Sequence, residues 1–229
     1  MTLKQRIAHV HQKVTEACER VGRSPEEINI VAVTKYVSTE QTARVLDEGI
    51  LHIGENRWQN AKPKWEALGD RGVWHFIGQL QSNKVKDVVG RFAYIHSLDR
   101  LSLAKELERQ AAAADVTIKA FVQVNISGEA SKSGMRPEEA FEFVRQVGQY
   151  SHIELIGLMT MAPLDGDAEA ARPVFRGLRE LRDELNARGA LPKPLEHLSM
   201  GMSGDFEVAI EEGATWLRLG SILVGKEED

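Results

Sequence analysis

The 229-residue chain has little of several features that mark particular protein classes. It holds a single cysteine, Cys18, which excludes a disulfide framework and fits a reducing compartment. No apolar run approaches the roughly 18 residues of a membrane span, and the N-terminus lacks the apolar stretch of a secretion signal. We therefore expect a cytoplasmic protein with no membrane segment.

Basic runs and the common phosphate and metal motifs are also absent. The formal net charge is -5 and no cluster of Lys or Arg stands out, which argues against nucleic acid as a partner. Neither a complete Walker motif, G-x-x-x-x-G-K-S/T, nor G-x-G-x-x-G occurs, and no spacing resembles a zinc or iron site. No linker or low-complexity segment divides the chain, so we expect one domain over 1–229 and no bound metal.

What the chain does have is a regular alternation of two patterns. A stripe of apolar residues from Leu3 to Val21 predicts an N-terminal helix. Short apolar runs then predict strands, and amphipathic patterns that predict helices follow most of them. The predicted strands are 29–34, 51–54, 73–78, 93–97, 118–125, 154–160, 196–200 and 215–219, and examples of the predicted helices are 39–47, 100–114, 137–149 and 168–187. Eight such alternations predict an α/β fold, a (β/α)8 TIM-type barrel with an extra N-terminal helix, with an open doubly wound sheet as the alternative.

The first predicted strand runs into a lysine. Val31, Val33 and Lys35 share one side of this strand, because side chains alternate along it. A buried ammonium group is costly unless it has a partner, a water-filled opening or a reaction to perform, and a buried lysine amine can act as a nucleophile. The alternative is a lysine at the end of a strand that simply reaches solvent.

In a barrel, functional residues gather where the strands end. Polar residues and glycines crowd these positions, whereas the strands themselves are apolar. The segments concerned are Gly54-Glu55-Asn56, Gln79 to Lys84, Gln123-Val124-Asn125, Ser199 to Gly204 and Arg218 to Ser221. We therefore expect a site at this rim.

The loops after the last two strands predict an anion site. Gly201 and Ser203 precede a predicted helix at 205–212, and Gly220 and Ser221 follow the eighth strand. Glycines let backbone N–H groups approach a phosphate closely, and a helix N-terminus adds a partial positive charge. The alternative is a pair of plain turns with a helix cap.

Arg218 is the third element of the predicted site, beside Lys35 and the two loops that are expected to bind an anion. It has the parity of Gly220 and is expected to face the barrel mouth, with a rim salt bridge to Glu55 as the alternative. A lysine amine, an arginine and a phosphate-binding loop together describe a holder for pyridoxal phosphate. The lysine would form an imine, the loops would take the phosphate and the arginine would meet the ring.

Several long motifs resemble a known family. The strings AVTK, HIGEN, HFIGQLQSNK, SKSG, GLMTM, LSMGMSGDFEVAIEEG and RLGSILVG closely resemble those of the pyridoxal phosphate homeostasis proteins, over essentially the whole chain. The resemblance implies a fold-type III barrel like the N-terminal domain of alanine racemase, with pyridoxal 5′-phosphate on Lys35 as an internal aldimine. It places Arg218 near the pyridine nitrogen and Asn56 near the cofactor. The phosphate contacts that it implies are Ser203, Gly220 and Ser221, together with Ser199 and Gly201.

The chain departs from this family in two stretches. Where the family has Tyr-Val-Gln-Glu after Gly-Glu-Asn, residues 57–60 read Arg-Trp-Gln-Asn, and Gln79 stands where proline is common. Lys132, in the SKSG string, is assigned no role and is expected to be solvated. His75 and His197 are interpreted as core residues with hydrogen bonds to the backbone.

Two functions are compared for such a site. A carrier would hold pyridoxal phosphate without strong catalytic activity, and would pass it as a monomer to apo-enzymes that depend on the cofactor. The alternative is an amino-acid racemase, which needs acid/base groups on both faces of the substrate. In alanine racemases the second group is a tyrosine of a further domain. The chain ends ten residues after Leu219, so we expect no such domain, and Tyr36, Tyr94 and Tyr150 have no evident claim to the role. We therefore expect no catalytic residue. A Schiff-base aldolase ranks last, because it needs no arginine facing a ring.

Overall fold

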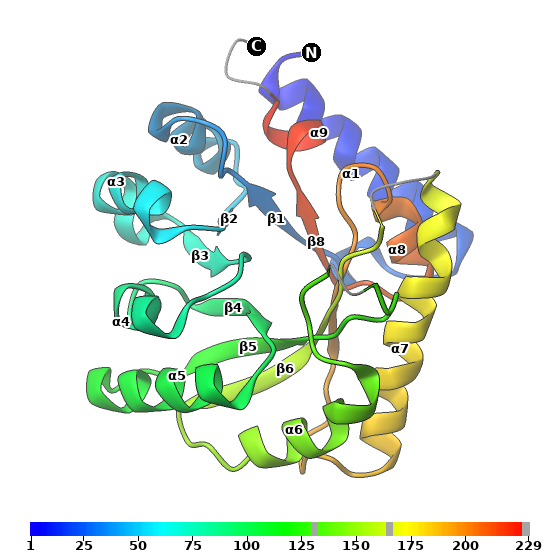
Figure 1. The fold of residues 1–229 in the computed structure, drawn as a ribbon. Coiled ribbons are helices and arrows are strands. Elements are labelled where there is room, and N and C mark those ends of the chain that lie inside the picture. Colours follow the sequence, from blue (N-terminus) through cyan, green and yellow to red (C-terminus); the bar gives the residue numbers. More distant parts are fainter. Residues whose placement is uncertain (130–131, 164–166, 226–229) are drawn as a thin grey trace.

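Eight parallel strands close into a barrel in the computed structural model, which describes residues 1–129, 132–163 and 167–225 (Figure 1). Strands that follow one another in the chain pair in the sheet, and β8 pairs with β1. The strands are β1 (Asn29–Val33), β2 (His52–Glu55), β3 (Val73–Phe76), β4 (Tyr94–Leu98), β5 (Ile118–Gln123), β6 (Ile153–Met159), β7 (His197–Ser199) and β8 (Trp216–Leu219). The predicted single (β/α)8 barrel is confirmed, and the open sheet is excluded.

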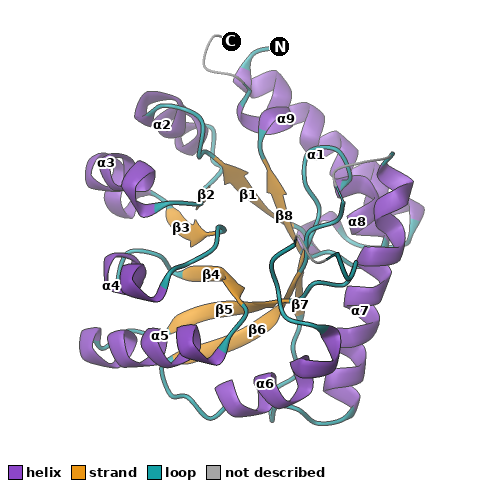
Figure 2. Ribbon diagram, viewed as in Figure 1, coloured by secondary structure: helices purple, strands orange, loops and turns teal. Residues whose placement is uncertain are grey.

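Helices surround the barrel on its outside (Figure 2). They are α1 (Leu3–Arg20), α2 (Thr39–Asp47), α3 (Trp58–Leu68), α4 (Val85–Val88), α5 (Leu101–Ala114), α6 (Ala140–Val147), α7 (Arg172–Ala187), α8 (Phe206–Glu211) and α9 (Ser221–Val224). Single 3-10 turns are η1 (Pro25–Glu27), η2 (Gly69–Arg71), η3 (Ser82–Lys84), η4 (Pro137–Glu139) and η5 (Ala168–Ala171). The helix predicted at 205–212 is shorter than expected, and α3, α4 and α9 were not predicted. Within the described ranges, no helix is long and apolar enough to cross a membrane.

The extra N-terminal helix α1 forms for local reasons and packs against the end of the chain. The Thr2 side chain caps its first turn and Gln5 returns the contact, which satisfies two backbone N–H groups. Val10, Val14 and Cys18 lie on its buried stripe, and the helix contacts α8 and α9 (Figure 1). Burial raises the pKa of the Cys18 thiol, so this cysteine is a packing residue.

The alternation of side chains along β1 divides the core into two parts. Ala32 belongs to the large core between the barrel and its helices, whereas Val31 packs inside the barrel with Phe121, Met159 and Trp216. Residues of the parity of Val31 therefore point inward. The next inward positions after Val31 are Val33 and Lys35, which lie beyond the packed interior at the open end of the barrel.

Candidate functional site

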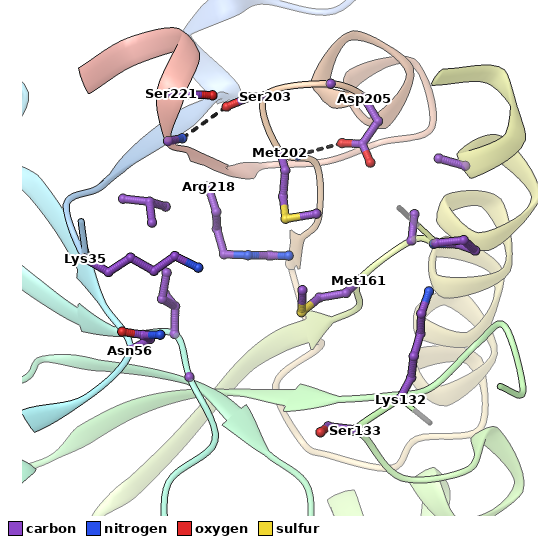
Figure 3. Close-up of a pocket in the computed structure, with 18 of the residues that line it drawn as sticks. Lys35, Asn56, Lys132, Ser133, Met161, Met202, Ser203, Asp205, Arg218 and Ser221 are labelled. Atoms are coloured by element: carbon purple, nitrogen blue, oxygen red, sulfur yellow. Dashed lines mark hydrogen bonds between the residues drawn. The ribbon is translucent and has the colours of Figure 1, made fainter. Parts of the chain in front are cut away.

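A cavity of about 920 Å³ opens at the carboxyl ends of the strands (Figure 3). Ligand sites occur at this end of (β/α)8 barrels, because the loops after the strands surround it. Polar and apolar residues of these loops both line the cavity. They include Lys35, Tyr36, Asn56, Gln79, Gln123, Asn125, Lys132, Ser133, Met161, Asp167, Met202, Ser203, Asp205, Arg218, Gly220 and Ser221.

The structure brings six of the eight predicted site residues to this cavity. They are Lys35, Asn56, Ser203, Arg218, Gly220 and Ser221. The other two, Ser199 and Gly201, lie beneath it. Ser199 is fully buried at the end of β7, and the Gly201 carbonyl accepts a hydrogen bond from the backbone N–H of Arg218. Those two residues therefore support the floor of the cavity in this structure.

Lys35 projects into the cavity from the end of β1, and Arg218 projects into the same space from β8 (Figure 3). Val33 lines the cavity as well, which agrees with the predicted parity of Val33 and Lys35. The Lys35 ammonium lies 4.8 Å from the centre of the Tyr36 ring, and that ring is 82% exposed at the rim. A primary amine is thus held at the wall of an open cavity.

Arg218 is 4% exposed and bonds to neutral partners. Its Nη1 donates to Ser199 Oγ at 2.6 Å and its Nη2 to the Thr160 carbonyl at 3.0 Å. Burial lowers the pKa of Arg218 to about 10, and nearby Asp205 opposes this shift, so the guanidinium stays protonated at neutral pH. The alternative of a salt bridge to Glu55 is wrong, because Glu55 is fully buried and pairs with Lys64.

The loops after β7 and β8 are tied together by one hydroxyl group. Ser203 Oγ accepts hydrogen bonds from the backbone N–H groups of Gly220, at 3.2 Å, and Ile222, at 3.5 Å. The backbone N–H groups of Ser203 and Gly204 have no acceptor among the described residues. Free donors and two serine hydroxyls, of Ser203 and Ser221, thus stand at one end of the cavity.

Two glycines beside the cavity are required by close packing. Gly201 has a φ of 96°, and a Cβ there would lie 2.7 Å from the Cβ of Ala209 in α8. A Cβ at Gly78, after β3, would collide with the backbone oxygen of Asn56. Neither position can carry a side chain without moving its neighbour, so both help to place the cavity wall.

The wall opposite Lys35 carries a second lysine that sequence reasoning left without a role. Lys132 Nζ is buried and lies 3.2 Å from a carboxylate oxygen of Glu129, and the side chain lines the cavity (Figure 3). The expectation of a solvated Lys132 is therefore wrong. The signal that was available is its short, glycine-bounded loop directly after β5, at the same rim as the other site residues.

Asp205 was also missed, although it belongs to a quoted motif. Its carboxylate accepts a hydrogen bond of 2.6 Å from the backbone N–H of Met202 (Figure 3). Burial raises the pKa of Asp205, while this hydrogen bond and the charge of Arg218 oppose the shift. The carboxylate thereby stabilises the turn that leads to Ser203.

The two departures from the family pattern have different places in the structure. Trp58 lies in α3 against Trp65 and Phe92, and neither it nor Arg57 is among the described residues that line the cavity. Gln79 does line the cavity and donates from Nε2 to Gln123 Oε1 at 2.9 Å. Only the second departure therefore changes the wall of the cavity.

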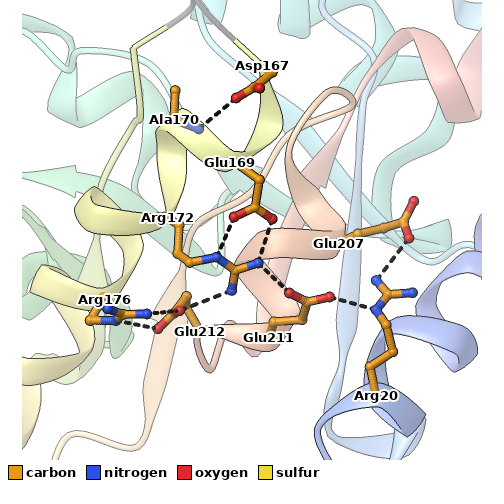
Figure 4. A network of polar contacts seen from close by, with 9 residues as sticks. All are labelled: Arg20, Asp167, Glu169, Ala170, Arg172, Arg176, Glu207, Glu211 and Glu212. Atoms are coloured by element: carbon orange, nitrogen blue, oxygen red, sulfur yellow. Dashed lines mark hydrogen bonds and ion pairs between the residues drawn. The ribbon is translucent and has the colours of Figure 1, made fainter.

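A polar network on the outer surface secures another part of the wall (Figure 4). Arg172, at the start of α7, donates to carboxylates of Glu169, Glu211 and Glu212, and Arg20 of α1 also donates to Glu211. The hydrogen bonds that Arg172 donates to Glu169 and Glu211 raise the pKa of Arg172 further above its usual value. The network joins η5, which follows a loop that lines the cavity, to α8 and α1.

His75 and His197 lie in the barrel, as expected for core residues, but their hydrogen-bond partners differ from the expectation. His75 bonds to His52 and His96, and His197 bonds to the hydroxyl of Thr215. The backbone contacts predicted for the two rings are therefore replaced by side-chain contacts. Within the described ranges, His, Cys, Asp and Glu side chains form no group of three that could hold a metal ion.

Comparison with known proteins gives a consistent picture. Residues 5–228 match the model of the family described as alanine racemase, N-terminal domain. The chain is 42% identical to the pyridoxal phosphate homeostasis protein of Aquifex aeolicus over 229 residues, which is 100% of both chains. It is 36% identical to the protein of the same name from Escherichia coli, covering 97% of this chain and 95% of that one.

Solved structures agree with the sequence relatives. The chain is similar to PipY of Synechococcus elongatus, a structure solved with PLP bound, with a TM-score of 0.86, 32% identity and coverage of 98% of this chain and all of that one. An alanine racemase of Clostridium difficile has a TM-score of 0.75 at 15% identity, and the match covers 96% of this chain and 56% of the racemase. The second likeness shows a shared fold alone.

Proposed function

Because the chain belongs to the family of the pyridoxal phosphate homeostasis proteins, we propose that it binds pyridoxal 5′-phosphate in this cavity and takes part in vitamin B6 homeostasis. The observation that carries the proposal is that Lys35, Arg218 and the loop after β7 that contains Ser203 (the Ser203 loop) line the same cavity. The cofactor offers an aldehyde, a pyridine nitrogen and a phosphate, and each has a matching group in the chain.

The donor set of the cavity fits the cofactor at both ends. When bound, the cofactor supplies an aldehyde carbon with which a neutral primary amine forms an imine and releases water. Lys35 is the amine placed at the end of β1, and Asn56 lines the cavity beside it. At the other end, the free N–H groups of Ser203 and Gly204 and the hydroxyls of Ser203 and Ser221 can donate to a phosphate.

Arg218 decides the electronic character of the bound ring. A guanidinium can only donate hydrogen bonds, so a pyridine nitrogen facing it must be unprotonated. An unprotonated ring is a poor acceptor of the electrons released when a substrate loses its α-proton. Arg218 thus favours holding the cofactor over activating an amino acid.

Positions of the tyrosines further support a carrier over a racemase. Tyr36 follows Lys35 directly, Tyr94 stacks on His75 inside the barrel, and Tyr150 packs against the outer core. Among the described residues, then, none supplies a tyrosine on the face opposite Lys35. We propose that the protein holds the aldehyde in masked form and passes the cofactor to apo-enzymes.

Exchange of α-protons tests the carrier proposal directly. With the cofactor bound, the protein is expected not to catalyse sustained exchange of the α-protons of L-amino acids for deuterium in heavy water. Mass spectrometry of the amino acids measures the exchange, with the Lys35→Ala protein as the control. Many turnovers that depend on Lys35 would show that the protein is an enzyme.

Phosphate recognition is the second expectation in this section. Pyridoxal, which lacks the phosphate, is expected to bind at least about 100-fold more weakly than pyridoxal 5′-phosphate, because two hydrogen bonds to a charged group contribute about 1.5–3 kcal/mol each. Ser203→Ala is expected to weaken only the phosphorylated form. Ser133→Ala, on the opposite wall, is the matched control. Equal affinities for the two compounds in equilibrium titrations would refute the phosphate site.

A further inference from the structure

A line of hydrogen-bonded side chains runs through the barrel interior beneath the cavity. Arg218 Nη1 lies 2.6 Å from Ser199 Oγ, and Ser199 Oγ lies 2.8 Å from His96 Nδ1. His96 Nε2 lies 2.9 Å from His75 Nδ1, and His75 Nε2 lies 2.9 Å from His52 Nδ1. The five residues come from β8, β7, β4, β3 and β2 in that order.

The interior surrounding this line favours neutral rings. Tyr94 stacks on His75 with the ring centres 4.3 Å apart, and Phe121 stacks on His96 with the centres 4.4 Å apart. Both imidazoles are fully buried, and burial lowers the pKa of each well below its ordinary value. No carboxylate of a described residue forms an ion pair with either ring.

The chemistry of the groups gives the line one direction. Arg218 can only donate, so Ser199 Oγ accepts from it, and the hydroxyl hydrogen of Ser199 is left to donate to His96 Nδ1. A neutral imidazole that accepts at Nδ1 donates at Nε2, so His96 donates to His75 and His75 donates to His52. His52 is half-buried, and its Nε2–H can reach water.

This direction is the one that a buried cation favours. Each lone pair in the line faces the Arg218 side, and each N–H or O–H points away from it. The aligned dipoles therefore stabilise the guanidinium, for which no carboxylate of a described residue is an ion-pair partner. A doubly protonated ring would place a donor against a donor and a second positive charge near the first.

We propose that His96, His75 and His52 are positioning residues that keep Arg218 charged and aimed at the bound ring by holding Ser199 in one orientation. The inference rests on the proposed function only in the last step, since Arg218 is proposed to meet the pyridine nitrogen. The line itself is a property of the protein without cofactor. Breaking it should let the Ser199 hydroxyl rotate and leave the Thr160 carbonyl as the one remaining fixed partner of Arg218 among the described residues.

Nitrogen-15 NMR of the histidine rings tests the line in the protein without cofactor. His52, His75 and His96 are expected to be neutral at pH 7 and to carry their hydrogen on Nε2. A doubly protonated ring, or a hydrogen on Nδ1 of any of the three, would overturn the proposed direction. This measurement does not depend on whether the protein binds pyridoxal phosphate.

Substitutions test the effect on the bound cofactor. His96→Phe keeps a ring against Phe121 but removes both hydrogen bonds, and is expected to shift the visible absorbance of the bound cofactor and to speed its release by about tenfold, the factor for about 1.4 kcal/mol. His75→Phe and His52→Phe should change the absorbance and the release rate in the same direction, with a smaller effect for His75→Phe and the smallest for His52→Phe. His197→Phe, which lies outside the line, is the matched control.

The outcomes separate the two proposals. A wild-type protein that fails to bind the cofactor refutes the proposed function, whereas the NMR spectrum still decides the line. A folded His96→Phe protein with the wild-type absorbance and release rate would overturn the positioning role. Far-UV circular dichroism and a cooperative unfolding transition establish that each variant is folded.

Discussion

Replacing Lys35 with alanine is expected to abolish the yellow colour that the wild-type protein acquires with pyridoxal phosphate. The colour comes from the imine, and in this cavity Lys35 is the amine at the end of β1 that shares a wall with Arg218. Borohydride adds hydride to the imine carbon, so the wild-type protein should lose its colour and keep the cofactor covalently on Lys35. The variant should give no adduct.

The site of the adduct is the decisive measurement, because the cavity contains a second lysine. Lys132→Ala is the matched control and is expected to keep both the colour and the adduct. Tryptic mapping by mass spectrometry locates the modified residue. An adduct on Lys132 of the wild-type protein would contradict the assignment of Lys35. Weak binding that survives in Lys35→Ala is expected to depend on the phosphate, because the Ser203 loop is untouched.

The barrel and the place of Lys35 could be predicted because each depends on a local rule. Eight apolar runs separated by helix-length segments leave few alternatives to a barrel, and the parity of Val31, Val33 and Lys35 follows from strand geometry. The same parity rule placed Arg218 at the cavity. The parity rule can be applied to each strand separately, without knowing how the strands are aligned.

Hydrogen bonds between side chains of different strands could not be predicted from the pattern of a single strand. The hydrogen bonds of His52, His75 and His96 depend on how three strands are aligned, and the sequence carries no direct record of that alignment. Ser199 is similar: its motif suggested a contact with phosphate, but its register against β8 places it beneath Arg218. A motif marked Ser199 as a site residue, but none marked His52 or His96, and only the register of the strands shows which groups these side chains bond.

The buried pair of Lys64 and Glu55 was missed for a related reason. Lys64 lies on α3, a helix whose pattern was not recognised and whose interior holds a proline. A lysine on an outer helix is normally solvated, so nothing local marks this one as buried. Lys64 is buried because it pairs with the carboxylate of Glu55, which is itself buried at the end of β2.

This pair is expected to make the largest single contribution to stability among the salt bridges of the described residues. Lys64 Nζ donates to Glu55 Oε1 at 2.8 Å and to the Thr34 carbonyl at 2.5 Å, and the Thr34 hydroxyl donates to the same Glu55 oxygen at 2.6 Å. Glu55 is 0% exposed, and its other carboxylate oxygen has no hydrogen-bond partner among the described residues. Removal of Lys64 would therefore leave the buried carboxylate without a counter-charge and with only the hydrogen bond from Thr34.

Lys64→Met is expected to lower the free energy of unfolding by about 3–5 kcal/mol, the range for breaking a buried ion pair. Lys62→Met, two residues earlier on the same helix, breaks the exposed pair with Glu66 and is expected to cost about 0–1 kcal/mol. Urea denaturation of both variants measures the difference. Equal losses would show that the buried pair contributes no more than an exposed one.

A second substitution separates the charge of Glu55 from the packing of Lys64. Adding Glu55→Gln to Lys64→Met is expected to recover part of the lost stability, because a neutral amide is less costly to bury than an unpaired carboxylate. A double variant less stable than Lys64→Met would mean that the hydrogen bond from Thr34 matters more than the charge. Since Thr34 directly precedes Lys35, the same variants should also show whether this pair holds the end of β1, through the rate at which Lys35 takes up the cofactor.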